Sequence, residues 1–162
     1  MKIMIFGDTA SGKSRFAEIL ATRMNLPLVH LDKVMEEIGR SDRTSIGQQI
    51  KKVTLTERWI IEGNAFTKDP EYRIKEADRI FVFDFSRTTT FINYIKRYVR
   101  LRSKAETRKG SDSVALNLSY FIPYIFIKFP PRKKQAVLFA KSLDKEIITF
   151  RSYKDIDNFL NK

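Results

Sequence analysis

The sequence lacks residues on which several classes of protein depend. Its 162 residues include no cysteine and a single histidine, His30. The absence of cysteine excludes a disulfide scaffold, a cysteine-based zinc site and a cysteine nucleophile, and it fits a reducing compartment such as the cytoplasm, where we expect this protein. His30 lies among apolar residues, with no Ser, Asp or Cys arranged as its partner, so we expect it to be structural.

Long apolar runs are also missing. The first apolar run, residues 3–6, is far shorter than the apolar region of a signal peptide and leads directly into Gly7 and Asp8. A second segment, residues 114–129, is rich in aromatic residues, but polar residues and Pro123 interrupt it below spanning length. We therefore expect no transmembrane span. For residues 114–129 we expect a buried or half-buried helix kinked at Pro123, with an interfacial membrane anchor as the alternative.

Positive charge is abundant and unevenly distributed. The chain has 31 Lys and Arg against 19 Asp and Glu, a net charge of +12. Residues 96–145, called the basic block below, hold 13 basic and 3 acidic residues, whereas residues 1–95 hold 15 and 13. Such a block attracts polyanions, which include nucleotide phosphates, nucleic acid and anionic membrane surfaces.

Short apolar runs alternate with amphipathic segments along the chain. We predict strands over residues 2–6, 26–31, 59–61, 79–85 and 146–150. We predict helices over residues 13–24, 45–56, 70–77, 88–103, 114–129, 130–143 and 152–160. This alternation indicates one α/β domain over residues 1–162, with three layers in which helices cover both faces of a five-stranded parallel sheet. A polar, charged break after the fourth helix makes residues 97–113 a candidate lid.

The most specific motif follows the first predicted strand. Residues 7–14, Gly-Asp-Thr-Ala-Ser-Gly-Lys-Ser, match the P-loop or Walker A pattern GxxxxGK[ST] at every fixed position. In this pattern backbone N–H groups surround a phosphate, the lysine contacts the outer phosphates and the final hydroxyl ligates Mg²⁺. We predict an ATP-binding loop made of Gly7, Asp8, Thr9, Ala10, Ser11, Gly12, Lys13, Ser14 and Arg15. A glycine-rich turn without a ligand is the alternative.

Acidic residues follow the second and third predicted strands. The carboxyl ends of parallel strands line one crevice, so Asp32 and Glu62 should both point towards the P-loop. Glu62 can hold Mg²⁺ through water together with Ser14, and Asp32 can accept a proton from a substrate hydroxyl. A helix cap for Glu62 and a solvated strand end for Asp32 are the alternatives. Asp84, after the fourth strand, either contributes to the site or pairs with Arg87.

Basic residues recur on one face of the helix predicted after the fourth strand. Arg97, Arg100 and Lys104 are spaced i, i+3 and i+7. Such a face can neutralise a phosphoryl group in transit, so we predict Arg97 and Arg100 as catalytic residues together with Lys13 and Asp32. A solvated helix face is the alternative.

The order of these motifs resembles the bacterial "DNA topology modulation" proteins, small P-loop proteins related to adenylate and shikimate kinases. The resemblance spans nearly the whole chain, and it rests on residues 7–14, 30–32, 59–64, 78–87, 96–97 and 147–152. It implies a nucleoside-phosphate-kinase-like fold with strand order 2-3-1-4-5, a substrate region after the second strand and an arginine-bearing lid after the fourth. The chain departs from the family at Glu36 and Ala65, where the family usually has aromatic residues. We predict substrate contacts from Asp32, Asn64 and Arg87.

Two hypotheses about function follow. The first is an ATP- and Mg²⁺-dependent phosphotransferase, a kinase whose acceptor is a small molecule such as a nucleotide or nucleoside. The second is a DNA-binding regulator of DNA topology, in which the basic block contacts backbone phosphates, although no helix-turn-helix, finger or ribbon signature is present. A steep fall of affinity with salt would distinguish the second from the first.

Overall fold

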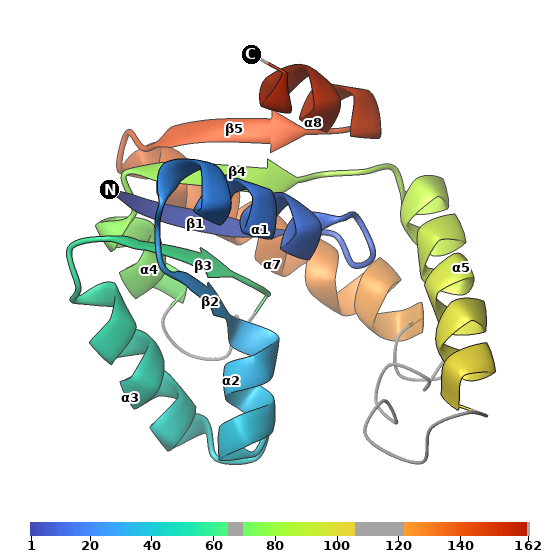
Figure 1. Ribbon diagram of the computed structural model, residues 1–162, viewed down its shortest axis with the longest axis horizontal. Helices are drawn as coiled ribbons and strands as arrows, with labels where there is room; N and C mark the ends of the chain where they lie inside the picture. The colour runs from blue at the N-terminus through green and yellow to red at the C-terminus, as the bar shows by residue number, and fades with distance from the viewer. Residues whose placement is uncertain (65–69, 106–121, 162) are drawn as a thin grey trace.

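The computed structural model describes residues 1–64, 70–105 and 122–161 (Figure 1). The strands are β1 (Lys2–Gly7), β2 (Leu28–His30), β3 (Trp59–Glu62), β4 (Arg79–Phe83) and β5 (Glu146–Phe150). The α-helices are α1 (Lys13–Met24), α2 (Leu31–Ile38), α3 (Arg43–Thr54), α4 (Pro70–Glu76), α5 (Arg87–Ala105), α7 (Phe129–Ser142) and α8 (Tyr153–Leu160). A π-helical turn, η1 (Tyr124–Lys128), leads directly into α7.

The five strands form one parallel sheet in the order β2-β3-β1-β4-β5, which confirms the predicted fold class and strand order. The central strand β1 pairs with β3 on one side and with β4 on the other, so that Ile3 lies opposite both Ile60 and Arg79. The connection that leaves β1 runs towards β2, whereas the connections that leave β3 and β4 run towards β5, so the direction of the connections changes beside β1. In open α/β sheets, ligands bind beyond the carboxyl ends of the strands at such a point.

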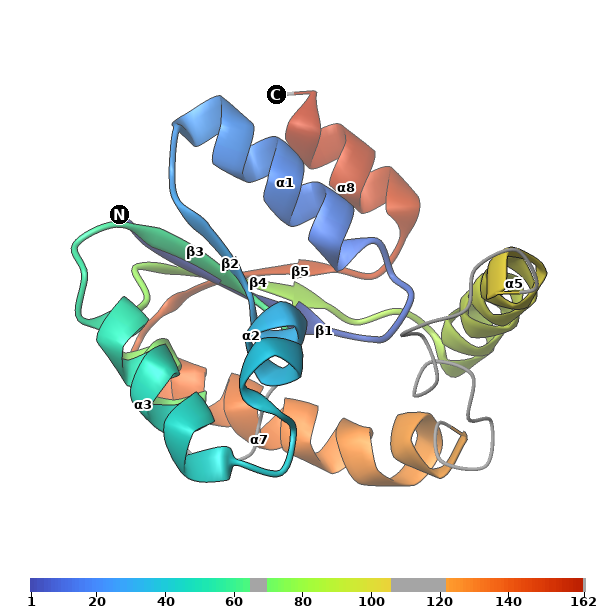
Figure 2. The same ribbon diagram turned by 60° about the horizontal axis from the view of Figure 1, so that its bottom comes forward.

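Apolar residues on both faces of the sheet build two cores. In β1, Ile3 and Ile5 pack with α1 and α8, whereas Met4 and Phe6 pack with α3, α4 and α7. Successive side chains of a strand point to opposite faces, so an unbroken apolar run such as residues 3–6 is what a strand covered on both sides requires. Figure 2 shows α1 and α8 on one side of the sheet and α3 and α7 on the other.

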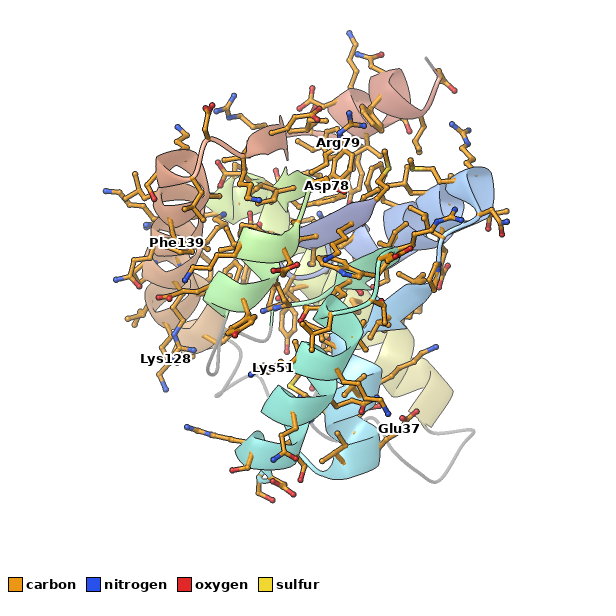
Figure 3. All side chains as sticks on the ribbon, turned by 90° about the vertical axis from the view of Figure 1, so that its left-hand side faces the viewer. Glu37, Lys51, Asp78, Arg79, Lys128 and Phe139 are labelled. Atoms are coloured by element: carbon orange, nitrogen blue, oxygen red, sulfur yellow. The ribbon has the colours of Figure 1, made fainter. Side chains whose placement is uncertain are left out.

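Cation–π contacts tie the helices of the second layer to one another. The Nζ of Lys51 on α3 lies 5.3 Å from the ring centre of Tyr72 on α4, and the Nζ of Lys75 on α4 lies 5.8 Å from that of Phe139 on α7. Figure 3 looks at the molecule from the side where the strands begin and labels Lys51 and Phe139 on their helices. These cation–π contacts lie away from the carboxyl ends of the strands, so we assign them a structural role.

Helix α2 is absent from the sequence-based prediction, which left residues 32–44 without an element. This helix begins directly after β2, with His30 as its N-cap and no side-chain hydrogen bond at that cap. The usual signals of a helix start, a loop and a Ser, Thr, Asp or Asn cap, are therefore missing. Consequently Asp32 lies in the first turn of a helix and not at the end of a strand.

Several predicted boundaries also move. Helix α3 begins two residues earlier than predicted, at Arg43, because the Asp42 carboxylate caps it by accepting a hydrogen bond from the N–H of Ser45 (3.0 Å). The helix predicted to start at Pro130 instead begins at Phe129 and continues from η1 without a break. The start of α8 is as predicted, since Ser152 and Asp155 form a capping box.

Two predictions fall largely outside the described residues. The predicted lid over residues 97–113 runs beyond the end of α5 at Ala105, and most of the aromatic helix over residues 114–129 precedes η1. Within residues 1–64, 70–105 and 122–161, no helix has the length and apolar character needed to cross a membrane.

Candidate functional site

The P-loop joins β1 to α1 at the carboxyl edge of the sheet. Gly7 has φ +136°, and a Cβ there would lie 2.2 Å from the carbonyl oxygen of Phe83, so glycine is required where the loop passes β4. Gly12, with φ +89°, is the N-cap of α1, and neither a side-chain cap nor an acidic residue occupies the first turn of that helix. The N–H groups at the start of α1 are therefore available to an anion.

Lys13 lies folded against this loop. Its side chain is only 8% exposed, and its Nζ donates a hydrogen bond to the carbonyl oxygen of Asp8 (2.6 Å). Burial lowers the pKa of Lys13, while the negative charges of Glu62, Asp8 and Asp32 oppose that shift and the positive charge of Arg97 adds to it. Two acids and one arginine predicted to be functional, Glu62, Asp32 and Arg97, thus lie within electrostatic range of the lysine.

Glu62, the last residue of β3, lies beside the end of the P-loop. The Oγ of Ser14 donates a hydrogen bond to Glu62 Oε2 (3.2 Å), and the Nδ1 of His30 lies 3.0 Å from the same oxygen. His30 comes from the end of β2, the neighbouring strand, and pairs in register with Glu62. The structural role that we expect of His30 is therefore to hold the carboxylate of Glu62 in place.

The chemistry of this pair fits a Mg²⁺ ion bound together with a nucleotide. Magnesium prefers oxygen ligands and usually keeps several waters, with one or two carboxylates and substrate phosphates completing its shell. Ser14 and Glu62 supply a hydroxyl and a carboxylate at the end of the phosphate-binding loop. Among the described residues no group of three or more His, Asp or Glu could hold a metal. An ion here would therefore take its remaining ligands from phosphate and water.

The side chain of Asn64 forms hydrogen bonds with Gly7, the first residue of the P-loop. Its Oδ1 accepts a hydrogen bond from the N–H of Gly7 (3.0 Å), and its Nδ2 donates to the carbonyl oxygen of Gly7 (2.7 Å). The side-chain amide thus satisfies both backbone groups of Gly7 and fixes the position of β1 relative to the end of β3. A contact between Asn64 and a substrate stays a prediction.

The other predicted catalytic residues surround the loop on separate elements. Asp32 is exposed in the first turn of α2, and Arg97 and Arg100 are exposed on α5. The electrostatic effects of Asp32 and Arg97 on Lys13 indicate that both residues lie near the P-loop. The side chain of Lys104, the third residue of the predicted basic face, lies outside the described residues.

An ion-pair cluster on the β4 side of the loop was not predicted. Lys133 Nζ of α7 lies 2.8 Å from Asp8 Oδ1 and 2.6 Å from Asp84 Oδ1, and Asp8 Oδ2 also accepts a hydrogen bond from the N–H of Phe85 (2.8 Å). Burial raises the pKa of Asp8, although Lys133 and the N–H of Phe85 oppose the shift. Asp84 therefore pairs with Lys133, and the predicted alternative of a pair with Arg87 is replaced.

Three features of the structure were not predicted: the cap Asp42, the ion pairs of Lys133 and the partner of His30. The sequence contained a signal for only the first of them. Asp42 was readable as a cap, since Asp is one of the residues preferred at the N-cap of a helix. Lys133 offered no signal, because it is one of several lysines in the basic block and contacts a residue 125 positions away. The partner of His30 became visible only once β2 and β3 were known to pair.

Comparison with known proteins supports the fold more strongly than any single activity. No family model matches the chain. Among curated proteins, the chain is 27% identical over 158 residues to "tRNA dimethylallyltransferase 2" of two Bacteroides fragilis strains. The match covers 96% of this chain and 47% of those proteins, so the chain spans about half the length of the curated relatives it matches.

Among solved structures, two shikimate kinases resemble the chain over nearly its whole length. The enzyme from Bacteroides thetaiotaomicron gives a TM-score of 0.60 at 16% identity, with 99% of this chain and 94% of that one covered. The enzyme from Aquifex aeolicus gives 0.55 at 14% identity, with 99% and 95% covered. Together with the sheet order, these similarities show that the chain has the P-loop kinase fold. The finer resemblance to the DNA topology modulation proteins stays a prediction.

Proposed function

We propose that the chain is an ATP-dependent phosphotransferase that acts on a small-molecule acceptor. One observation carries this proposal: a buried lysine in a P-loop lies within electrostatic range of two carboxylates, Glu62 at the end of β3 and Asp32 at the start of α2, and of one arginine, Arg97. A turn with only a structural role has no need of a buried cation, because a buried charge costs stability unless it is paired and hydrogen-bonded. The same constellation suits a substrate that carries several negative charges.

Each residue has a proposed task in the transfer. Bound here, Mg²⁺-ATP would supply the phosphoryl group and offset part of its charge. Lys13 and the N–H groups at the start of α1 hold the phosphates, while Ser14 and Glu62 hold the metal. Arg97 and Arg100 neutralise the phosphoryl group as it moves.

The transfer forms one bond to phosphorus and breaks another, and it needs one group that accepts a proton. The oxygen of the acceptor hydroxyl forms a bond to the outermost phosphorus atom, and the bond between that phosphorus and the bridging oxygen of ADP breaks. The hydroxyl proton passes to the carboxylate of Asp32. Asp32 is exposed at the start of α2, on the edge of the site where an acceptor can enter.

A labelled-phosphate assay tests the proposal. The protein is incubated with Mg²⁺ and ATP labelled in the outermost phosphate, together with a panel of nucleosides, nucleotides, sugars and hydroxy acids. We expect label on one class of acceptor, and we expect Asp32→Asn to lower kcat by roughly 10²-fold or more with little change in the KM for ATP. Asp42→Asn is a matched control, because Asn caps a helix about as well as Asp.

Two results would count against these assignments. Label on none of the acceptors would contradict the phosphotransferase proposal as a whole. Equal kcat in Asp32→Asn and wild type would contradict the role of Asp32 alone.

A second candidate is group transfer to an RNA acceptor. It is favoured by the match to a tRNA dimethylallyltransferase along 96% of the chain and by the excess of positive charge in the basic block. Filter binding to bulk tRNA tests it, and tight, strongly salt-dependent binding is the expected result. The similarities found give no support to the hypothesis of a DNA-binding regulator.

A further inference from the structure

A cavity lies beside the P-loop, on the side of β4, α5 and α7. Its volume is about 180 Å³. Its lining includes Asp8, Asp84, Phe85, Arg87, Thr90 and Lys133. Asp8 connects the cavity to the phosphate-binding lysine, because its carbonyl oxygen accepts the hydrogen bond from Lys13 Nζ while its carboxylate faces Lys133.

Thr90 gives this cavity an unused polar group. The residue is only 3% exposed, and among the residues that the structure describes its Oγ1 has no hydrogen-bond partner. Its backbone is satisfied, since its N–H donates to the carbonyl oxygen of Ser86 (2.9 Å). A buried hydroxyl without a partner costs stability, and native proteins rarely keep one without a reason. A ligand in the cavity would supply the missing hydrogen bond.

The charges around the cavity favour a ligand without net charge. Two carboxylates, Asp8 and Asp84, are balanced by Lys133 and Arg87. Lys133 already lies between the two carboxylates, so an added anion would be repelled by both and an added cation would compete with the lysine. Hydroxyl groups suit this environment, because each can donate to a carboxylate oxygen and accept from Thr90, Lys133 or Arg87.

The size of the cavity limits the ligand further. An apolar cavity of about 150 Å³ holds one benzene ring, so 180 Å³ accommodates one ring and little more. The ring of Phe85 offers an apolar surface on which one face of such a ring can pack.

We propose that this cavity binds a single neutral ring that carries hydroxyl groups, from a free monosaccharide or from the sugar of a nucleoside. The inference rests on the proposed function and deepens it, since it names the class of the acceptor. In the transfer described above, the reacting hydroxyl would be one that extends from this ring out of the cavity towards Asp32, since Asp32 does not itself line the cavity. Thr90 holds the ring and does not take part in the bond changes.

Ligand binding measured without nucleotide tests the proposal. Thermal unfolding is followed with D-ribose and D-glucose in one arm and with adenosine and thymidine in another, so that the two sources of the ring are distinguished. Ribose 5-phosphate is the charged control. We expect one of the neutral arms to raise the Tm and the charged control to give a smaller shift.

Variants of Thr90 separate a ligand contact from a structural role. Thr90→Val removes the hydroxyl and keeps the shape, so we expect its Tm without ligand to equal or exceed that of the wild type and its affinity for the ring to fall about tenfold. Thr90→Ser keeps the hydroxyl and should bind within a few-fold of the wild type. Unchanged affinity in Thr90→Val, a Tm several degrees lower in that variant, or no shift with any neutral probe would overturn the proposal.

Binding of Mg²⁺-ATP to the same proteins keeps the two proposals apart. If the ring binds and Mg²⁺-ATP does not, the phosphotransferase proposal fails and the assignment of the cavity stands. If Mg²⁺-ATP binds and no neutral ring does, the assignment of the cavity fails.

Discussion

At the residue scale, the site is built around the charge of Lys13, which does not stabilise the fold. Lys13 is buried, and burial lowers its pKa because the ammonium group loses its hydration. The nearby carboxylates of Glu62, Asp8 and Asp32 compensate only in part. Residues kept at a cost in stability are typical of functional sites, where the missing interaction is the one made with the ligand.

Replacing Lys13 by methionine tests this view. The apolar side chain keeps the packing and removes the buried charge, so we expect Lys13→Met to raise the free energy of unfolding by about 1 kcal/mol while ATP turnover is abolished. Urea unfolding and a turnover assay measure the two effects. A variant that is clearly less stable, or one that still turns over ATP, would contradict the role given to this lysine.

At the element scale, α7 is attached to the P-loop through one side chain. Lys133 lies between Asp8 and Asp84 and is mostly buried, with 14% of its side chain exposed. Helix α7 comes later in the chain than the residues predicted to form the lid, and this ion-pair cluster joins it to Asp8 of the P-loop. The position of α7 therefore depends on the charges of Asp8 and Asp84.

Lys133→Met should destabilise the protein by about 3 kcal/mol near pH 7, because it leaves two carboxylates without their cation. The loss should shrink on acidification. Burial holds the pKa of Asp8 above its ordinary value of 3.8, so the folded state keeps a proton that the unfolded state has lost, and stability falls as the pH rises through that window.

In Lys133→Met the pKa of Asp8 rises further, so the pH range over which stability falls becomes wider. Urea unfolding at about pH 4.5 and at pH 7 measures the difference. An equal loss of stability at both pH values would be inconsistent with the proposed ion pair.

The cap of α8 is a second feature at this scale, and it lies next to the P-loop, since the hydroxyl of Tyr153 donates a hydrogen bond to the carbonyl oxygen of Ala10 (3.4 Å). Ser152 accepts a hydrogen bond from the N–H of Asp155, and Ile156, one residue later, packs into the core. We expect Ser152→Ala to lower the free energy of unfolding by about 1 kcal/mol, because the N–H of Asp155 loses its acceptor. Calorimetry measures the loss, and an unchanged free energy of unfolding would contradict the role given to this cap.

At the scale of the whole molecule, local patterns predicted most of the fold and only part of the site. The unbroken apolar run at residues 3–6 and the Gly-rich loop that follows it are readable because each depends on neighbours in sequence. The strand order was available through the resemblance to a family and not from the periodicity itself. Helix α2 was missed because it follows β2 without a loop or a side-chain cap.

The parts of the site that escaped prediction are contacts between distant residues. Lys133 meets Asp8 across 125 positions, and His30 meets Glu62 because β2 and β3 pair in a particular register. Neither contact leaves a local pattern in the sequence. The charge of the basic block was visible, yet its total gave no indication that one of its lysines, Lys133, is largely buried against the P-loop.

The central claim is that the loop at residues 7–14 binds a nucleotide with Mg²⁺ held by Ser14 and Glu62. Isothermal titration of the wild type with ATP, in Mg²⁺ and again in EDTA, tests it most directly, with Glu62→Gln beside it. We expect binding that weakens at least tenfold in EDTA, and a similar weakening in Glu62→Gln when Mg²⁺ is present. Absence of binding, or an affinity that neither EDTA nor Glu62→Gln changes, would contradict it.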